Sequence, residues 1–290
     1  MLTQTEDIIR KVRELEIISK KLTTHLFTGE YHAAFKGKGM RFREVREYAP
    51  GDDVRFIDWN VSARFNNTFS KVFEEERELS VMLIIDTSSS NLFGTRGARK
   101  RDRINEMAAV LAFSAINNQD KAGAILFNDH VEQYIPPKKS RQHALYLVRH
   151  LLTAEPRHAG TNLSEAIKYF NRNIKQRSIA FILSDFIDNQ FENALRIIGK
   201  KHDVIGIKVY DLMDMELPDA GLIKMKDMET GNQQWVDTSN AEVRYRYHQH
   251  FIQHAEWCKN VFRKSGADLL HVRTDEDYVK ILQQFFRNRM

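Results

Sequence analysis

Three oxygen-bearing side chains spaced two residues apart, Asp86, Ser88 and Ser90, are the residues in this sequence best suited to chemistry. One carboxylate and two hydroxyls on a short loop offer hard oxygen ligands, the kind that Mg²⁺ and Mn²⁺ prefer. The loop therefore predicts a binding site for a hard divalent cation.

The residues before this loop must form the element that positions it. Residues 81–85, VMLII, are an apolar run with β-branched members that ends abruptly at Asp86. Such a run is typical of a strand buried on both faces. In an open α/β sheet the ligand crevice lies beyond the carboxyl ends of the strands, so Asp86 is expected at that crevice.

The rest of the chain alternates between strand and helix patterns. Further strands are predicted at residues 122–127, 131–135, 178–183, 204–210 and 269–272. Helices are predicted at residues 7–26, 104–117, 141–152, 191–199, 241–264 and 277–287, and from an N-cap at Ser164 to Asn173. Residues 222–226 and 233–236, joined across 230–232, read as a β-ribbon insertion. The pattern predicts an α/β fold with a doubly wound, mostly parallel sheet.

Composition agrees with a folded, soluble protein. Hydrophobic residues make up 42% of the 290 residues and aromatic residues 10%, enough to fill the core of such a fold. The single cysteine, Cys258, excludes an internal disulfide and fits a reducing compartment. The first residues lack the apolar block of a signal peptide, and no run approaches the roughly 18 apolar residues of a membrane helix. We therefore expect a cytoplasmic protein without membrane insertion.

Two more polar loops complete a recognisable order along the chain: Gly160-Thr161 before a predicted helix, and Asp185 directly after a predicted strand. Together with DxSxS at residues 86–90, this order resembles the metal-ion-dependent adhesion site of von Willebrand factor A-type domains. The resemblance implies that Ser88 and Ser90 bind Mg²⁺ (or Mn²⁺) directly. Thr161 would bind it directly or through water, and Asp86 and Asp185 would hold its coordinated waters. An open coordination position would then accept a partner's carboxylate, which makes the site a binding device.

A second resemblance covers more of the chain. The segments PGDDVRFIDW (50–59), SAR (62–64) and KVFEEERE (71–78), followed by VMLIID (81–86), resemble the bacterial family called domain of unknown function 58. The resemblance implies an N-terminal helix plus a family-specific extension over residues 1–75 and a von Willebrand factor A-like domain over 76–290. Family members are typically encoded beside MoxR-type AAA+ ATPases and are thought to act as their adaptor or chaperone-like partners. The implied function is a non-catalytic protein-interaction module that couples such an ATPase to a client protein.

An enzymatic alternative uses Asp86 as the nucleophile of a metal-dependent phosphatase or other hydrolase. Phosphatases of that kind need a second carboxylate two residues on, and Ser88 occupies that position. No P-loop and no GxSxG motif are present. His250 and His254 have the spacing to share a metal, but Phe251 stands where a zincin has glutamate, so solvated helix histidines are favoured.

Charged segments leave two further alternatives open. Arg96 to Arg103 is a basic run that predicts either a solvated loop or a surface steering an acidic partner towards the metal edge. Basic and aromatic residues interleave over 35–46, but nearby acids dilute the pattern, so no nucleic-acid partner is expected. Asp52 and Asp53 predict either a carboxylate site or a structural corner anchored by Trp59.

Overall fold

The protein is described from a computed structural model, which describes residues 10, 12–19, 40–65, 67–75, 79–95, 98–154, 160–228 and 231–289. The chain forms two compact units. One comprises Gly29–Glu78, and the other comprises Met1–Thr28 with Leu79–Met290. The larger unit carries all the residues predicted to bind metal.

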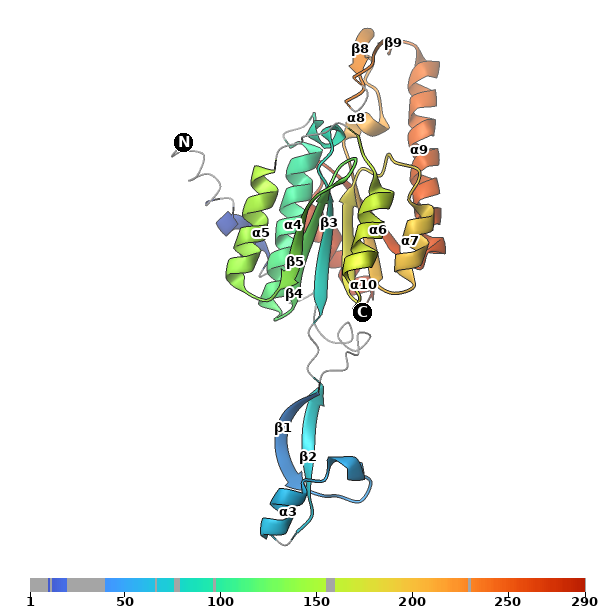
Figure 1. Cartoon of the computed structure of the whole chain (residues 1–290). Helices are drawn as coiled ribbons and strands as arrows, with labels where there is room; N and C mark the ends of the chain where they lie inside the picture. Colours follow the sequence, from blue (N-terminus) through green and yellow to red (C-terminus); the bar gives the residue numbers. More distant parts are fainter. Residues whose placement is uncertain are drawn as a thin grey trace. The chain divides into compact units, whose positions relative to one another are not determined.

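A six-stranded sheet forms the centre of the larger unit (Figure 1). Its strands are β3 (Ser80–Asp86), β4 (Lys121–Phe127), β5 (Val131–Lys138), β6 (Ile179–Ser184), β7 (Asp203–Tyr210) and β10 (Asp268–Arg273). Their order is β10-β7-β6-β3-β4-β5, and all neighbours are parallel except the β4–β5 pair. The chain moves outward from β3 in one direction through β4 and β5, then returns to β6 and moves outward in the other. The sheet therefore reverses between β3 and β6, which is where ligands bind in open α/β sheets.

Helices cover both faces of this sheet. One face carries α4 (Lys100–Asn117), α5 (Arg141–Thr153) and α10 (Tyr278–Arg289); the other carries α6 (Leu163–Asn173), α7 (Glu192–Gly199) and the C-terminal end of α9 (Ala241–Lys264) (Figure 1). This is the predicted α/β, doubly wound, von Willebrand factor A-like architecture. The fold-class prediction is confirmed, including the β-ribbon of β8 (Leu222–Lys226) and β9 (Gln233–Asp237).

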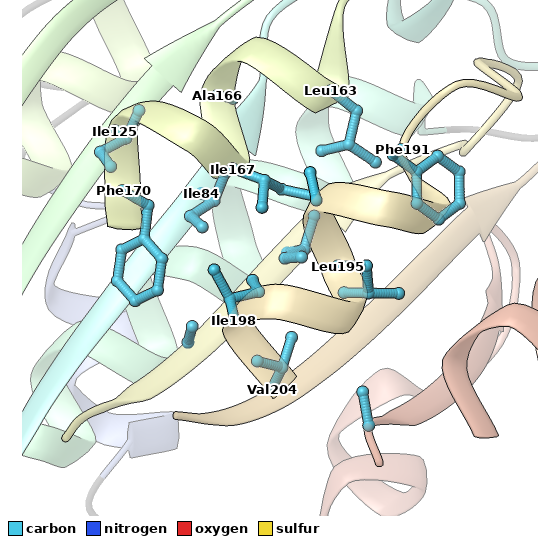
Figure 2. Close-up of a cluster of buried hydrophobic side chains, with 14 of the residues drawn as sticks. Ile84, Ile125, Leu163, Ala166, Ile167, Phe170, Phe191, Leu195, Ile198 and Val204 are labelled. Carbon is cyan, nitrogen blue, oxygen red and sulfur yellow. The ribbon is translucent and has the colours of Figure 1, made fainter. Parts of the chain in front are cut away.

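The side chains packed between the sheet and α6, α7 and α9 show why the strands read as apolar runs. Alternate residues of β3 and its neighbours meet those helices, as Ile84, Ile125, Ile167, Phe170 and Leu195 illustrate in Figure 2. All five are fully buried. In the central strands β3, β4 and β6, which are covered on both faces, nearly every position is buried, so the period-two pattern of a half-exposed strand is absent.

Several predicted element boundaries were wrong. Helix α4 begins at Lys100, so the second half of the predicted basic loop is helical; Arg96 lies outside the described residues. The N-cap of α6 is Asn162, whose side chain accepts from the Glu165 N–H at 3.0 Å, and not Ser164. A four-residue helix, α8 (Leu212–Met215), was not predicted.

The predicted N-terminal helix is described only in part. Residues 12–19 are helical, and the rest of the predicted range lies outside the described residues except for residue 10. Leu15 and Ser19 are buried, and the Ser114 hydroxyl of α4 donates to the Ser19 carbonyl at 3.3 Å. Glu16 pairs with Arg141 at the start of α5 at 2.9 Å. The described part of this helix therefore contacts α4 and α5 of the same unit.

The smaller unit contains an antiparallel pair, β1 (Met40–Glu47) with β2 (Phe69–Glu75), and a short helix, α3 (Trp59–Phe65). Asp52 accepts from the Ala49 N–H and Asp53 from the Arg55 N–H, both at 3.0 Å, so the two carboxylates bond their own backbone as a structural corner does. The predicted anchor was wrong, because Trp59 is 70% exposed. Among the described residues, no helix is both long and apolar enough to cross a membrane.

Candidate metal centre

The ends of β3 and β6 bring two buried carboxylates together at the point where the sheet reverses. Asp86 is the last residue of β3, and Asp185 directly follows β6. Asp86 is 1% exposed and Asp185 3%. The Ser184 hydroxyl donates to Asp86 Oδ2 at 2.5 Å and so joins the two strand ends.

The loop after β3 is folded by Asp86 itself. Asp86 Oδ1 accepts the Ser88 N–H at 2.9 Å, which turns the chain so that residues 89–92 form a short 3₁₀ helix. As a result, Ser88 Oγ and Ser90 Oγ lie 3.0 Å apart, and both residues are buried. Asn91 supports this turn by donating to the Asp86 carbonyl and to Ser88 Oγ, each at 3.3 Å.

The separation of the two serine hydroxyls suits a hard cation. Neighbouring ligands of an octahedral ion, each about 2.1 Å from Mg²⁺, lie about 3.0 Å from one another. Behind the hydroxyls, the buried carboxylates of Asp86 and Asp185 would supply negative charge to a bound ion. Asn91 Oδ1, a buried acceptor, finds no hydrogen-bond donor in the part of the chain that the structure describes. This donor set fits Mg²⁺ or Mn²⁺.

Thr161 lies at the same edge of the sheet, because the backbone N–H groups of the two residues after it anchor its loop there. The Asn162 N–H donates to the carbonyl of Asn128, just beyond β4, at 2.7 Å. The Leu163 N–H donates to Asp188, in the loop after β6, at 3.0 Å. Thr161 is half-buried between these anchored positions. The structure thus links Asp86, Ser88 and Ser90 by hydrogen bonds and holds Thr161 in a loop tied to the ends of β4 and β6.

Two lysines surround Asp185, and sequence reasoning assigned neither of them to the site. Lys100, the first residue of α4, places its ammonium 3.0 Å from Asp185 Oδ2 and 3.3 Å from Asp214 Oδ2. Lys208 of β7 donates to the Asp185 carbonyl at 2.5 Å. Lys100 is 2% exposed and Lys208 3%, so Lys100 lies neither in a solvated loop nor on a steering surface, the two alternatives predicted for the basic run. A lone lysine inside the apolar strand 203–210 was the signal that could have found Lys208.

Burial and charge shift the pKa values at this site in opposite directions. Burial, and then the charge of Asp185, raise the pKa of Asp86 to about 6. Burial is the largest single influence on Asp185 and acts to raise its pKa, but the charge and hydrogen bond of Lys100, the Lys208 charge and a hydrogen bond from Ser90 together hold that pKa below its ordinary value. Burial lowers the pKa of Lys208. Asp185 is therefore the more firmly ionised carboxylate.

A cavity of about 290 Å³ lies behind Asp185, between the sheet edge, α8 and α9. Lys100, Asp185, Lys208, Asp214, Tyr247 and His254 are among its lining residues. His254 Nδ1 lies 3.4 Å from the Lys208 ammonium, and burial, with the Lys208 charge, lowers the pKa of His254 to about 4. Among the described residues, His250 and His254 form no group of three or more side chains that could hold a metal. Cys258 is fully buried and belongs to the hydrophobic core.

Known proteins resemble this chain at the level of sequence and fold. The uncharacterized protein Mb1516 of Mycobacterium bovis is 32% identical over 281 residues, covering 96% of this chain and 88% of the relative. The uncharacterized protein YeaD of Bacillus subtilis is 32% identical over 111 residues, covering 38% of this chain and 25% of the relative.

Among solved structures, an aerotolerance-related membrane protein from Bacteroides fragilis, with multiple mutations to serines, matches with a TM-score of 0.51 and 16% identity. That match covers 73% of this chain and 100% of the other, and it shows likeness of fold alone. The SpRpn10 VWA domain matches with a TM-score of 0.39 and 12% identity, over 71% of this chain and 93% of the other. The family model described as protein of unknown function DUF58 matches residues 44–257, and the chain belongs to this family, as its sequence motifs predicted.

Proposed function

We propose that this protein is a non-catalytic, metal-dependent protein-interaction module that works in the cytoplasm. Ser88, Ser90 and Thr161 would hold Mg²⁺ or Mn²⁺, with Asp86 and Asp185 orienting its waters. The observation that carries the proposal is the pair of buried hydroxyls, Ser88 Oγ and Ser90 Oγ, 3.0 Å apart at the sheet reversal. Few direct negative ligands would leave the ion electrophilic, so a carboxylate from a partner protein suits the remaining position.

The chemistry of Asp86 supports binding over catalysis. Both of its carboxylate oxygens already accept hydrogen bonds, Oδ1 from the Ser88 N–H and Oδ2 from the Ser184 hydroxyl. A phosphatase nucleophile needs an oxygen that is free to attack, and Asp86 is 1% exposed. We therefore assign Asp86 to support of the metal site and not to a hydrolytic reaction.

The partner we propose is a MoxR-type AAA+ ATPase, which this chain would couple to a client protein. This part of the proposal is supported by membership of the DUF58 family, because the resemblance described in the sequence implies genes that lie beside those of such ATPases. In such a pair the ATPase would hydrolyse ATP, and this chain would supply recognition.

The experiment is affinity capture of the tagged full chain from its own cells, in Mg²⁺ and in EDTA. The Ser88→Ala/Ser90→Ala variant is captured in parallel. Ser140→Ala is the matched control, because Ser140 caps α5 at the opposite edge of the sheet and its loss touches no site residue. We expect an AAA+ ATPase that is recovered with the wild type and with Ser140→Ala in Mg²⁺, and is lost in EDTA and with the double variant. Equal recovery in all arms would contradict the metal-dependent part of the proposal, and recovery of no ATPase would contradict the partner.

A further inference from the structure

Lys100 stands between two carboxylates that come from different parts of the chain. Its ammonium contacts Asp185, at the candidate metal centre, and Asp214, in α8. An ammonium that is 2% exposed is costly to bury unless it is paired. Both carboxylates therefore stabilise the buried charge of Lys100, and one of them, Asp185, belongs to the site where a metal ion would bind.

The two carboxylates differ in how firmly other groups of the protein hold them. Asp214 is fixed by the capping box of α8, in which its Oδ2 accepts the Asp211 N–H at 2.8 Å. Asp211 is anchored in turn by the Thr95 N–H at 3.0 Å and the Thr274 hydroxyl at 2.9 Å. Asp185 faces the hydroxyls of Ser88 and Ser90, where it would also have to orient the waters of a bound ion.

The cavity behind Asp185 gives the Lys100 side chain room to move. Lys100 and Asp214 both line this space of about 290 Å³, which equals several water volumes. The lysine can therefore release Asp185 and remain paired with Asp214.

From these contacts we propose that Lys100 is an internal counter-cation that competes with the metal ion for Asp185. Metal binding then depends on whether an anionic group of a partner binds at the same time. The inference rests on the proposed metal-dependent function. One positive charge beside the site repels a divalent cation and attracts a carboxylate. Lys100 thus weakens binding of the metal alone and strengthens binding of the metal together with a carboxylate.

The test measures Mn²⁺ affinity by electron paramagnetic resonance, with and without acetate as the carboxylate probe and with chloride at equal ionic strength as its control. Wild type is compared with Lys100→Met, which removes the charge, and with Lys100→Arg, which keeps it. We expect Lys100→Met to bind Mn²⁺ at least about tenfold more tightly than the wild type. Acetate should tighten Mn²⁺ binding to the wild type and to Lys100→Arg, and should do so less for Lys100→Met.

A second pair of variants keeps the test decisive if Lys100→Met does not fold. Asp214→Asn leaves Lys100 with Asp185 alone, so Mn²⁺ affinity should fall further than in Glu216→Gln, which removes an exposed charge just beyond α8 without touching Lys100. Equal affinities in these two variants, or a Lys100→Met variant that binds Mn²⁺ no more tightly than the wild type, would overturn the role of Lys100. If neither the wild type nor any variant binds Mn²⁺ saturably, the proposed function fails as well.

Discussion

The Ser184 hydroxyl donates to Oδ2 of Asp86 at 2.5 Å, and this side-chain bond links the ends of β6 and β3, the paired strands between which the strand order reverses. Both residues are buried, and the acceptor is a carboxylate. A hydrogen bond to a buried charged group contributes more to stability than one between neutral groups. The bond also sets the orientation of Asp86, whose other oxygen folds the serine loop.

Replacing Ser184 with alanine should therefore weaken both the fold and the site. We expect a loss of about 2 kcal/mol in the free energy of unfolding, measured with denaturant, and weaker Mn²⁺ binding. Ser140→Ala is the control, because loss of that helix cap should cost about 1 kcal/mol and leave Mn²⁺ affinity unchanged. A Ser184→Ala protein with wild-type affinity would show that Asp86 does not need this bond.

The buried imidazole of His202 should make stability depend on pH. Burial lowers the pKa of His202 to about 4, and its Nε2 has no hydrogen-bond partner among the described residues. Below about pH 6.5 the unfolded chain binds a proton that the folded chain does not, so this contribution is complete above pH 6.5 and is lost as the pH falls towards 4. The loss approaches roughly 3 kcal/mol.

His202→Gln tests this assignment, because glutamine does not titrate. Denaturant unfolding of both proteins at several values between pH 7 and pH 4 should show the wild type losing stability relative to the variant. A constant difference between the two proteins over that range would contradict the assignment.

Two glycines with different surroundings test the packing of α9 on the sheet. A Cβ at Gly206 of β7 would lie 2.5 Å from the ring of Phe262 and 2.8 Å from Leu269. Gly206→Ala should therefore cost about 1–3 kcal/mol in thermal or denaturant unfolding. Among the residues that the structure describes, a Cβ at Gly160 would meet only Asp129, at 3.5 Å, so Gly160→Ala should be tolerated. Equal effects of the two substitutions would mean that α9 does not press on β7 as described.

The enzymatic alternative makes its own prediction. If Asp86 were a phosphatase nucleophile, Mg²⁺-dependent hydrolysis of 4-nitrophenyl phosphate would disappear in Asp86→Asn. Because both carboxylate oxygens accept hydrogen bonds, we expect the wild type and the variant to show the same background rate. A clear excess of activity in the wild type would overturn the assignment of Asp86 to support of the metal site.

Elements with a clear local sequence pattern were predicted correctly. The apolar run before Asp86 marked the central strand, and the periodicity of residues 241–264 marked α9 with its observed bounds. Helix α8 was missed because four residues are too few to show a helical period. The exposure of Trp59 was missed because a large aromatic residue is usually taken for core.

The place of Lys100 in the site could not be predicted for a different reason. Lys100 lies in a run of arginines and lysines, which is typical of a solvated surface. Its burial depends on a carboxylate 85 positions away in the chain. Such a contact is visible only once β6 lies beside β3, so the serines of the site were predictable and the burial of Lys100 was not.

The most direct measurement of the central claim is the position of a bound ion. Crystals grown with MnCl₂ would be measured at the manganese absorption edge, where an anomalous difference map identifies the metal by its own scattering. We expect one peak about 2.1 Å from both Ser88 Oγ and Ser90 Oγ, and no such peak in crystals of Ser88→Ala/Ser90→Ala. A peak at His250 and His254, or no peak beside the two serines at saturating Mn²⁺, would contradict the account.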